Sequence, residues 1–146
     1  MKYFSILFSL IVLIGVTNVN AQSTSSLNGN SYTFVLNDVN DQSIEIIDKF
    51  TFNNNKVVSE KYSAAKGYVC SNVTETVDGN SSSFQVTLTH PTEGTVSFNG
   101  RVIDNSIYGE AVISKNGQQS SLVFRGLTTQ AWDAAMKKQQ EESNSQ

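Results

Sequence analysis

Apolar and polar residues alternate along most of the chain, and turn-forming residues interrupt the alternation at regular intervals. A period of two is typical of β-strands with one buried face. The connections between these segments are short and polar, as they are in hairpins. The pattern predicts five strands in the first part of the chain, at residues 32–36, 43–52, 56–62, 68–77 and 82–89.

Three further strands are predicted between residues 95 and 127, where two tight turns define the pairing. With Asp104-Asn105 and Asn116-Gly117 as the turns, the apolar residues of all three strands face one side, and a slip of one residue would expose them. Across the first turn the opposed pairs are Val102 with Ile107, Gly100 with Gly109, and Phe98 with Ala111. Across the second turn the opposed pairs are Ile113 with Ser120, Ala111 with Leu122, and Gly109 with Phe124.

An earlier tight turn is predicted at Asp78-Gly79, between the fourth and fifth strands. This dipeptide is a strong hairpin signal, and it would place Val73 opposite Phe84 and Val69 opposite Leu88. In the later strands the glycines lie beside aromatic residues, and packing of rings over bare backbone is the simplest reason for them. The alternative is that these glycines open room for a ligand.

All six phenylalanines after residue 21 fall on the buried face of the predicted strands. Each strand joins the next by a short connection, and an eight-stranded meander can remove its exposed edges by closing into a barrel. We therefore predict an all-β fold, an eight-stranded antiparallel up-and-down barrel at residues 22–127. A two-sheet sandwich is the alternative, although it usually needs longer crossing connections.

The period changes after the last strand, where a short C-terminal helix is predicted at residues 128–140. Thr128-Thr129 offers a hydroxyl cap, and the residues that follow are good helix formers. Trp132 and Met136 share one side of such a helix, and we expect this side to lie on the barrel. Residues 141–146 are expected to form a disordered tail.

The first 21 residues are typical of a secretory signal peptide. Lys2 provides a positive start, residues 4–16 form an apolar centre, and Val19-Asn20-Ala21 is a suitable cleavage site. The apolar centre is shorter than the roughly 20 residues that a membrane-spanning helix needs. We expect a mature chain that begins at Gln22 and is secreted or periplasmic.

The mature chain is mildly acidic. The full sequence has a net charge of −3, and removal of Lys2 with the leader makes it −4. No basic patch is available to neutralise phosphates, so nucleic acid is not an expected partner. Cys70 is the single cysteine and cannot form an internal disulfide. We expect it to fill space on a strand, and the alternative is a reactive or intermolecular thiol.

Several short stretches resemble small secreted lipocalin-like proteins of bacteria. They are residues 50–59 (FTFNNNKVVS), 66–68 (KGY), 93–102 (EGTVSFNGRV), 107–109 (IYG), 115–117 (KNG) and 124–126 (FRG). The resemblance covers about residues 27–127, in order. It implies a calycin-type barrel, and because that bacterial family is mostly uncharacterised it implies a fold rather than an activity.

Calycins usually carry a Gly-x-Trp motif near the first strand and an arginine on the last strand that packs across the tryptophan. Here Gly29-Asn30-Ser31-Tyr32 occupies the first position, with Tyr32 in the aromatic role. Arg125 occupies the second. The resemblance therefore implies that Arg125 packs across Tyr32.

The sequence carries no enzyme signature such as Gly-x-Ser-x-Gly, a phosphate loop or a dinucleotide fingerprint. His90 is the single histidine and lacks partners for a metal site, so it is expected to be an ordinary loop residue. Asp48 is the best inward carboxylate, yet no partner for acid–base work is evident. We expect no catalytic residue, no metal and no cofactor. Asn72 and Asn80 begin glycosylation sequons, which matter only in a eukaryotic source.

The outward face of the last strands holds a ladder of three polar side chains. The predicted registers place Tyr108 opposite Arg101 on one neighbouring strand and opposite Arg125 on the other, with Glu110 one step away. Cation–π geometry is available to this ladder. It is interpreted either as surface stabilisation or as a patch that binds a protein partner.

Two functions are compatible with this fold. The first is a non-enzymatic carrier that holds a small apolar ligand inside the barrel. The second is a packed interaction or envelope-associated structural module with no small ligand. An interior void of at least about 300 Å³ would favour the carrier. The expected lining of such a cavity is Phe34, Phe52, Phe84, Val86, Phe98 and Phe124.

Overall fold

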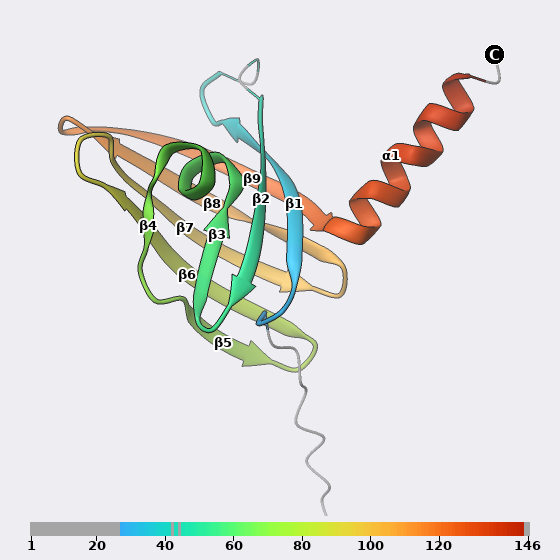
Figure 1. Cartoon of the computed structure of the whole chain (residues 1–146), viewed down its shortest axis with the longest axis horizontal. Coiled ribbons are helices and arrows are strands. Elements are labelled where there is room, and N and C mark those ends of the chain that lie inside the picture. Colours follow the sequence, from blue (N-terminus) through green and yellow to red (C-terminus); the bar gives the residue numbers. More distant parts are fainter. Residues whose placement is uncertain (1–26, 42, 44, 145–146) are drawn as a thin grey trace, which may run out of the picture.

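One antiparallel sheet curls into a nearly closed barrel, and an α-helix extends from its last strand (Figure 1). The computed structural model describes residues 27–41, 43 and 45–144. The predicted signal peptide lies outside these residues. The strand segments are β1 (Ser31–Asp38), β2 (Glu45–Asn53), β3 (Lys56–Ser59), β4 (Val69–Cys70), β5 (Thr74–Asp78), β6 (Ser81–His90), β7 (Gly94–Ile103), β8 (Ser106–Lys115) and β9 (Gln118–Thr128). The helical elements are the π-helical turn η1 (Glu60–Ala64) and α1 (Thr129–Ser143).

The strands follow one another around the barrel in the order β3-β2-β1-β9-β8-β7-β6-β4. β5 also pairs with β6, so β4 and β5 share one strand position and the barrel has eight. β1 pairs with β9, which joins the first strand of the meander to the last. Within the described sheet, β3 and β4 form no ladder, and we call this break the seam. The predicted all-β, eight-stranded antiparallel barrel with a C-terminal helix is confirmed.

The predicted pairing of the last three strands is also confirmed. Each opposed pair named for the two turns occurs in the β7–β8 and β8–β9 ladders. Asp104 and Asn116 open these turns with φ of 52° each, a conformation that asparagine and aspartate tolerate better than most residues. The register therefore follows from the turn residues, as the hydrophobic pattern requires.

The predicted fourth strand is not continuous. Residues 71–73 interrupt it, and they separate β4 from β5. The hairpin turn is Gly79-Asn80 rather than Asp78-Gly79, because Asp78 pairs with Ser81 and Gly79 takes a φ of 61° as the first central residue.

The register predicted for this hairpin is therefore wrong. Phe84 lies opposite Glu75, not Val73, and Leu88 lies opposite Cys70, not Val69. The irregular segment between β4 and β5 absorbs the difference between the two ladders, as β-bulges do.

The predicted third strand, residues 56–62, ends earlier than expected, at Ser59. The chain then turns into η1, and the Tyr62 side chain is buried. The Ser59 hydroxyl accepts a hydrogen bond from the Tyr62 backbone N–H at 2.8 Å, which is the role of a helix N-cap. The local capping interaction outweighs the strand pattern at this point.

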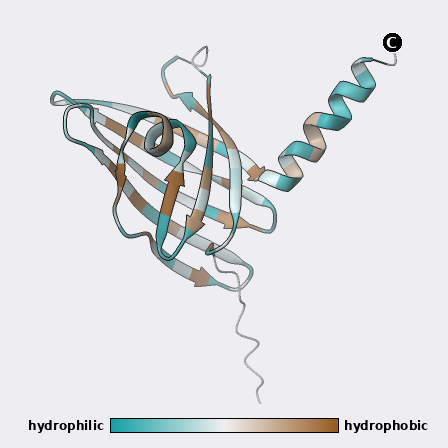
Figure 2. Ribbon diagram, in the orientation of Figure 1, coloured by the Kyte–Doolittle hydropathy of each residue, from teal (hydrophilic) through white to brown (hydrophobic). Residues whose placement is uncertain are grey.

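The core is the barrel interior, where the six predicted phenylalanines are buried with exposed fractions of 0–2%. Hydrophobic and hydrophilic residues alternate along the strands, whereas α1 is mostly hydrophilic (Figure 2). Alternation of this kind puts one set of side chains inside and the other outside. The structure thus confirms that the six rings share one face.

The C-terminal helix does not lie on the barrel as predicted. α1 projects away from the wall (Figure 1), Met136 is 44% exposed, and Trp132 is only half-buried. Thr128 is the last residue of β9 and also the N-cap of α1, with its hydroxyl 3.4 Å from the Ala131 backbone N–H. Without a loop between strand and helix, the chain cannot fold back onto the wall.

The helix also continues to Ser143, so its end replaces the first part of the predicted tail. None of the helices in the described part of the chain is long and apolar enough to cross a membrane.

Candidate functional site

The six residues predicted to line a cavity all point into the barrel, with exposed fractions of 0–3%. They contact one another. The ring centroids of Phe34 and Phe124 are 5.1 Å apart, and those of Phe52 and Phe84 are 5.3 Å apart. Phe50 joins them, at 4.8 Å from Phe34 and 4.7 Å from Phe98. The Phe34–Phe124 pair is tilted and the other three are edge-to-face, and ring contacts at these distances are favourable and leave little space between rings.

Two glycines show how tightly this part of the interior is packed. A Cβ atom on Gly100 would lie 2.5 Å from Cζ of Phe84 and 2.7 Å from Cζ of Phe124. A Cβ atom on Gly109 would meet Phe124 at 2.8 Å and also the backbone of β7. The interpretation of these glycines as ring-over-glycine packing is confirmed. They accommodate the rings and leave no room for a ligand there.

The mouth beside η1 contains a buried carboxylate, Asp48. Its oxygens accept hydrogen bonds from the Ser59 hydroxyl at 2.6 Å, the Lys61 backbone N–H at 2.8 Å and the Lys49 backbone N–H at 2.7 Å. Burial raises the pKa of Asp48, although these three bonds oppose the rise. Burial, with the nearby Asp48 carboxylate, also raises the pKa of Tyr62 to about 12.

Sequence reasoning looked for an acid–base partner of Asp48 and missed these three hydrogen-bond donors. All three donors belong to β2, β3 and η1, so the carboxylate ties these elements together. The sequence did carry a signal for the start of η1. Ser59 has the hydroxyl of a helix N-cap and is followed directly by the acidic residue Glu60, a combination typical of helix starts. The geometry is that of a structural clamp on η1, because Ser59 is fully buried and cannot reach a substrate.

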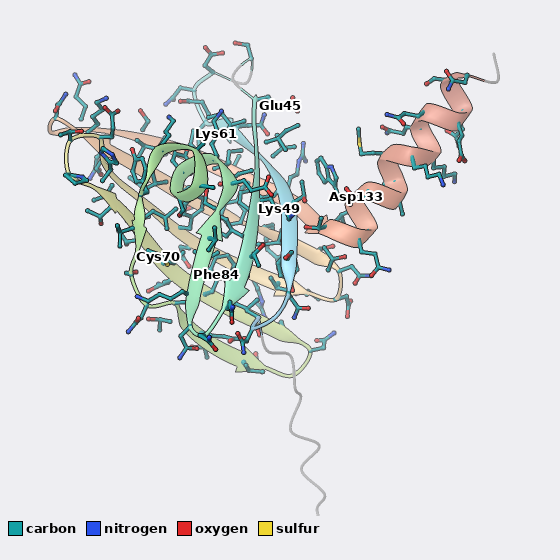
Figure 3. All side chains as sticks on the ribbon, viewed as in Figure 1. Glu45, Lys49, Lys61, Cys70, Phe84 and Asp133 are labelled. Carbon is teal, nitrogen blue, oxygen red and sulfur yellow. The ribbon has the colours of Figure 1, made fainter. Side chains whose placement is uncertain are left out.

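At the seam, Cys70 takes the place of a missing ladder bond. Its sulfur accepts a hydrogen bond from the Val57 backbone N–H at 3.3 Å, and its carbonyl accepts one from Nζ of Lys56 at 3.2 Å. The thiol also donates to the Ser71 carbonyl at 2.8 Å. Cys70 lies half-buried on β4 (Figure 3). The expectation of a small residue on a strand is confirmed, and the structure adds this bridging role.

The opposite end of the barrel is closed by Leu27, which is 2% exposed. Its backbone N–H donates to a carboxylate oxygen of Glu75 at 3.1 Å. A cavity of about 10 Å³ remains beside it, which is close to the volume that a single water needs. It is lined by Leu27, Asn28, Phe52, Asn53, Asn55, Lys56, Val73 and Glu75.

His90 ends β6 and orders the loop that follows. Its Nδ1 accepts hydrogen bonds from the backbone N–H groups of Thr92 at 3.2 Å and Glu93 at 3.1 Å. Its ring lies 5.2 Å from that of Tyr68. Among the described residues, no group of three or more histidine, cysteine or acidic side chains is placed to hold a metal ion.

The outward ladder of Arg101, Tyr108 and Arg125 has the predicted register. Arg101 points elsewhere, because its guanidinium donates to the Ser81 hydroxyl at 2.8 Å. Neither arginine stacks on the Tyr108 ring. In the described structure the cation–π contact is that of Lys66 over the ring of Tyr62. The ladder is therefore a row of exposed side chains and not a stacked unit.

Apolar side chains continue this row across β9, β1 and β2. Arg125 pairs with Val35, and Val35 with Ile47, which is 58% exposed. Val39 and Val123 are 52% and 45% exposed on the same wall. We call the set of Val39, Ile47, Tyr108, Val123 and Arg125 the outer patch.

A groove of about 480 Å³ lies in this wall. It is lined by Asn37, Asp38, Val39, Val123, Phe124 and Arg125. Sequence reasoning missed the groove, because residues 37–42 fall in one of the short polar connections between the predicted strands. Clusters of exposed apolar residues next to a groove mark binding surfaces more often than chance.

Comparison with protein-family models, curated proteins and solved structures found no match. The nearly closed antiparallel barrel with a C-terminal helix is compatible with a lipocalin-like barrel.

The calycin packing implied by the resemblance does not form. Tyr32 is 4% exposed and faces the interior, where its ring lies 6.0 Å from that of Phe52. Arg125 is exposed on the outer face. The two side chains occupy opposite faces of the sheet, so Arg125 cannot pack across Tyr32.

Proposed function

We propose that the protein is a secreted or periplasmic, non-enzymatic interaction module, in which a packed barrel presents the outer patch to a protein partner. One observation carries this proposal. The inward aromatic side chains contact one another, while apolar side chains gather outside the barrel around a groove. A carrier would place its apolar lining around a void.

The groove suggests the chemistry of the partner. Val39 and Val123 offer apolar surface, and Arg125 lies beside them without an ion pair to any described residue. A protein segment that presents an apolar side chain and a carboxylate would match both features. Arginine and tyrosine are enriched at the centres of such interfaces.

A matched pair of variants tests the outer patch. Val123 and Val77 are each 45% exposed, but only Val123 lines the groove. Val123→Glu should abolish capture of the partner from the native extracellular or periplasmic fluid, while Val77→Glu should retain it. Equal capture by both variants would contradict the proposed surface.

An apolar fluorescent probe tests the packed interior. We expect no stoichiometric binding to the wild type. Val86→Trp should destabilise the barrel by about 1–3 kcal/mol, because Val86 lies opposite Phe98 in a filled interior. Denaturant unfolding followed by circular dichroism measures this loss.

The carrier of a small apolar ligand is the second candidate. It is supported by the wholly aromatic and aliphatic lining, and by the seam, where a thiol replaces part of the hydrogen-bond ladder. A carrier would bind about one probe per chain. Val86→Trp would then exclude the probe without unfolding the barrel, which is the reverse of the result expected above.

We also propose that the chain is a lipocalin-like protein and that it is exported through its signal peptide. Mass spectrometry of the exported protein should find Gln22 as its first residue. An intact Met1 on exported protein would contradict the cleavage.

A further inference from the structure

The loop between β6 and β7 is held by an imidazole. Nδ1 of His90 accepts hydrogen bonds from the backbone N–H groups of Thr92 at 3.2 Å and Glu93 at 3.1 Å. The Thr92 hydroxyl lies 3.2 Å from the same nitrogen. A ring nitrogen that accepts hydrogen bonds carries no proton, so the single proton of the neutral ring is on Nε2.

This arrangement requires the neutral ring. An imidazole gains a proton in mildly acidic solution, and both of its nitrogens then carry hydrogen. Nδ1 of protonated His90 would point an N–H at the two backbone N–H groups that it binds in the neutral state. Donors that face a donor lose their hydrogen bonds, so the loop conformation that brings these groups together loses its support.

The charged groups around His90 do not supply a new partner for the charged ring in the closed loop. The Glu93 carboxylate, on the same loop, is bound by Nζ of Lys115 at the end of β8. This bond, with the charge of Lys115, lowers the pKa of Glu93, and Lys66 before β4 adds to the effect. Glu93 is therefore still a carboxylate paired with Lys115 when an imidazole gains its proton. A charged His90 would have to compete with both lysines for it.

The loop also covers one mouth of the barrel. The His90 ring lies 5.2 Å from the ring of Tyr68, and the Tyr68 hydroxyl is 3.4 Å from the Glu93 carbonyl oxygen. Tyr68 is 7% exposed, and its ring packs 5.5 Å from that of Tyr62 in η1. Figure 1 shows the loop and η1 at the same end of the barrel. Burial raises the pKa of both tyrosines, so neither of them titrates in the range where an imidazole does.

We propose that His90 is a pH-sensitive switch at this mouth. In its neutral form the imidazole holds the loop of residues 90–94, and the loop holds Tyr68 over the mouth beside η1. Protonation of Nδ1 releases the backbone N–H groups of Thr92 and Glu93, the loop opens, and Tyr68 becomes accessible to solvent. The switch lies outside the outer patch, so it does not depend on the proposed partner.

The position of His90 suits this role. The side chain is half-buried, so protons from solvent can reach it. His90 and Gly94 form the last pair of the β6–β7 ladder. The loop between them can therefore open while the ladder stays intact, which makes the response local and leaves the barrel folded.

Two variants separate the acceptor from the charge. An asparagine side chain can present an oxygen to the backbone N–H groups that follow it, and it does not titrate. His90→Asn should therefore keep the loop closed at neutral pH and in mild acid. His90→Phe keeps a ring beside Tyr68 but has no acceptor, so its loop should be open in both conditions. The wild type should match the first variant at neutral pH and the second in acid.

Nuclear magnetic resonance of the mature chain measures the switch directly. His90 is the single histidine, so the signals of its ring report protonation without ambiguity. As the ring gains its proton, protection of the Thr92 and Glu93 amides from solvent exchange, corrected for the pH dependence of exchange itself, should fall about tenfold in the wild type. It should stay unchanged in His90→Asn. Hydroxyl-radical labelling of Tyr68 should rise over the same range, while that of Tyr108, which is 41% exposed, should stay constant.

Three results would overturn the proposal. The first is protonation of the His90 ring without loss of amide protection in the loop. The second is an equal loss of protection in the wild type and His90→Asn, because another group, such as the buried Asp48, would then be the sensor. The third is a barrel that unfolds before the ring gains its proton. Val123→Glu in the outer patch should leave the switch unchanged, which separates this test from that of the proposed function.

Discussion

Phe124→Ala should be among the most destabilising single changes in this protein. The ring is 2% exposed, and its centroid lies 5.1 Å from that of Phe34, 5.8 Å from Phe98 and 6.4 Å from Phe84. Truncation of a buried phenylalanine costs about 3–5 kcal/mol through lost transfer energy and the cavity left behind. Aromatic pairs contribute a further ~0.5–1.5 kcal/mol each.

The cost should lie in the upper part of that range, about 4–5 kcal/mol. Phe124 belongs to β9, which pairs with β1 on one side and β8 on the other. Two ladders hold the backbone in place, so the site cannot collapse into the cavity. Because small domains have only about 5–15 kcal/mol of stability, this single change would remove a large share of it.

Urea unfolding followed by circular dichroism measures the loss. The neighbouring outward residue provides the control, since Val123 is 45% exposed and Val123→Ala should change stability by less than about 0.5 kcal/mol. A loss below about 1 kcal/mol for Phe124→Ala would show that the ring does not belong to a packed interior. A barrel interior with room for a ligand would then be the better account.

Three further predictions concern the barrel ends and the seam. Asp48→Ala should speed hydrogen exchange in η1, because three donors lose their shared acceptor; unchanged exchange would contradict the clamp. Cys70→Ser should keep the bridge to Val57 whereas Cys70→Ala should lose it, seen as faster exchange of the Val57 amide only in the alanine variant. The hydrogen bond from Lys115, with its charge, lowers the pKa of Glu93, so the stability from this pair is present at neutral pH and lost as pH falls through that lowered pKa. Wild type and Lys115→Met should therefore differ in melting temperature at pH 7 and converge in acid, and a difference independent of pH would contradict this.

The sequence predicted best the part of the fold where local chemistry and burial agree. Asn116-Gly117 admits one hairpin register, and that register buries Phe124 over Gly109. The turn residues alone, or the burial pattern alone, would have left alternative strand registers open. Together they defined three strands and the ring packing between them.

Predictions failed where a local pattern was overruled by a contact distant in sequence. At η1 the local cap of Ser59 on Tyr62 is reinforced by Asp48, on β2, which accepts a hydrogen bond from Lys61. The sequence already placed the helix directly after the last strand, but Trp132 and Met136 suggested a packing on the barrel that the missing loop prevents. The groove could not be predicted either, since it forms between Val39 and Val123, which are remote in the sequence and meet only when β1 pairs with β9.

The position of the seam has a consequence for folding. While a barrel forms, two of its strand edges are still unpaired. Here those edges meet at the seam and belong to β3 and β4, which are in the middle of the chain. β6 to β9 are neighbours in sequence and can pair early, whereas the closing ladder joins Phe34 to Gly126, 92 residues away. Contacts of such separation form slowly, because loop entropy opposes them. The N-terminal segment β1–β3 should thus add to a preformed meander as one unit, so a chain cut between β3 and β4 should still assemble from its two fragments.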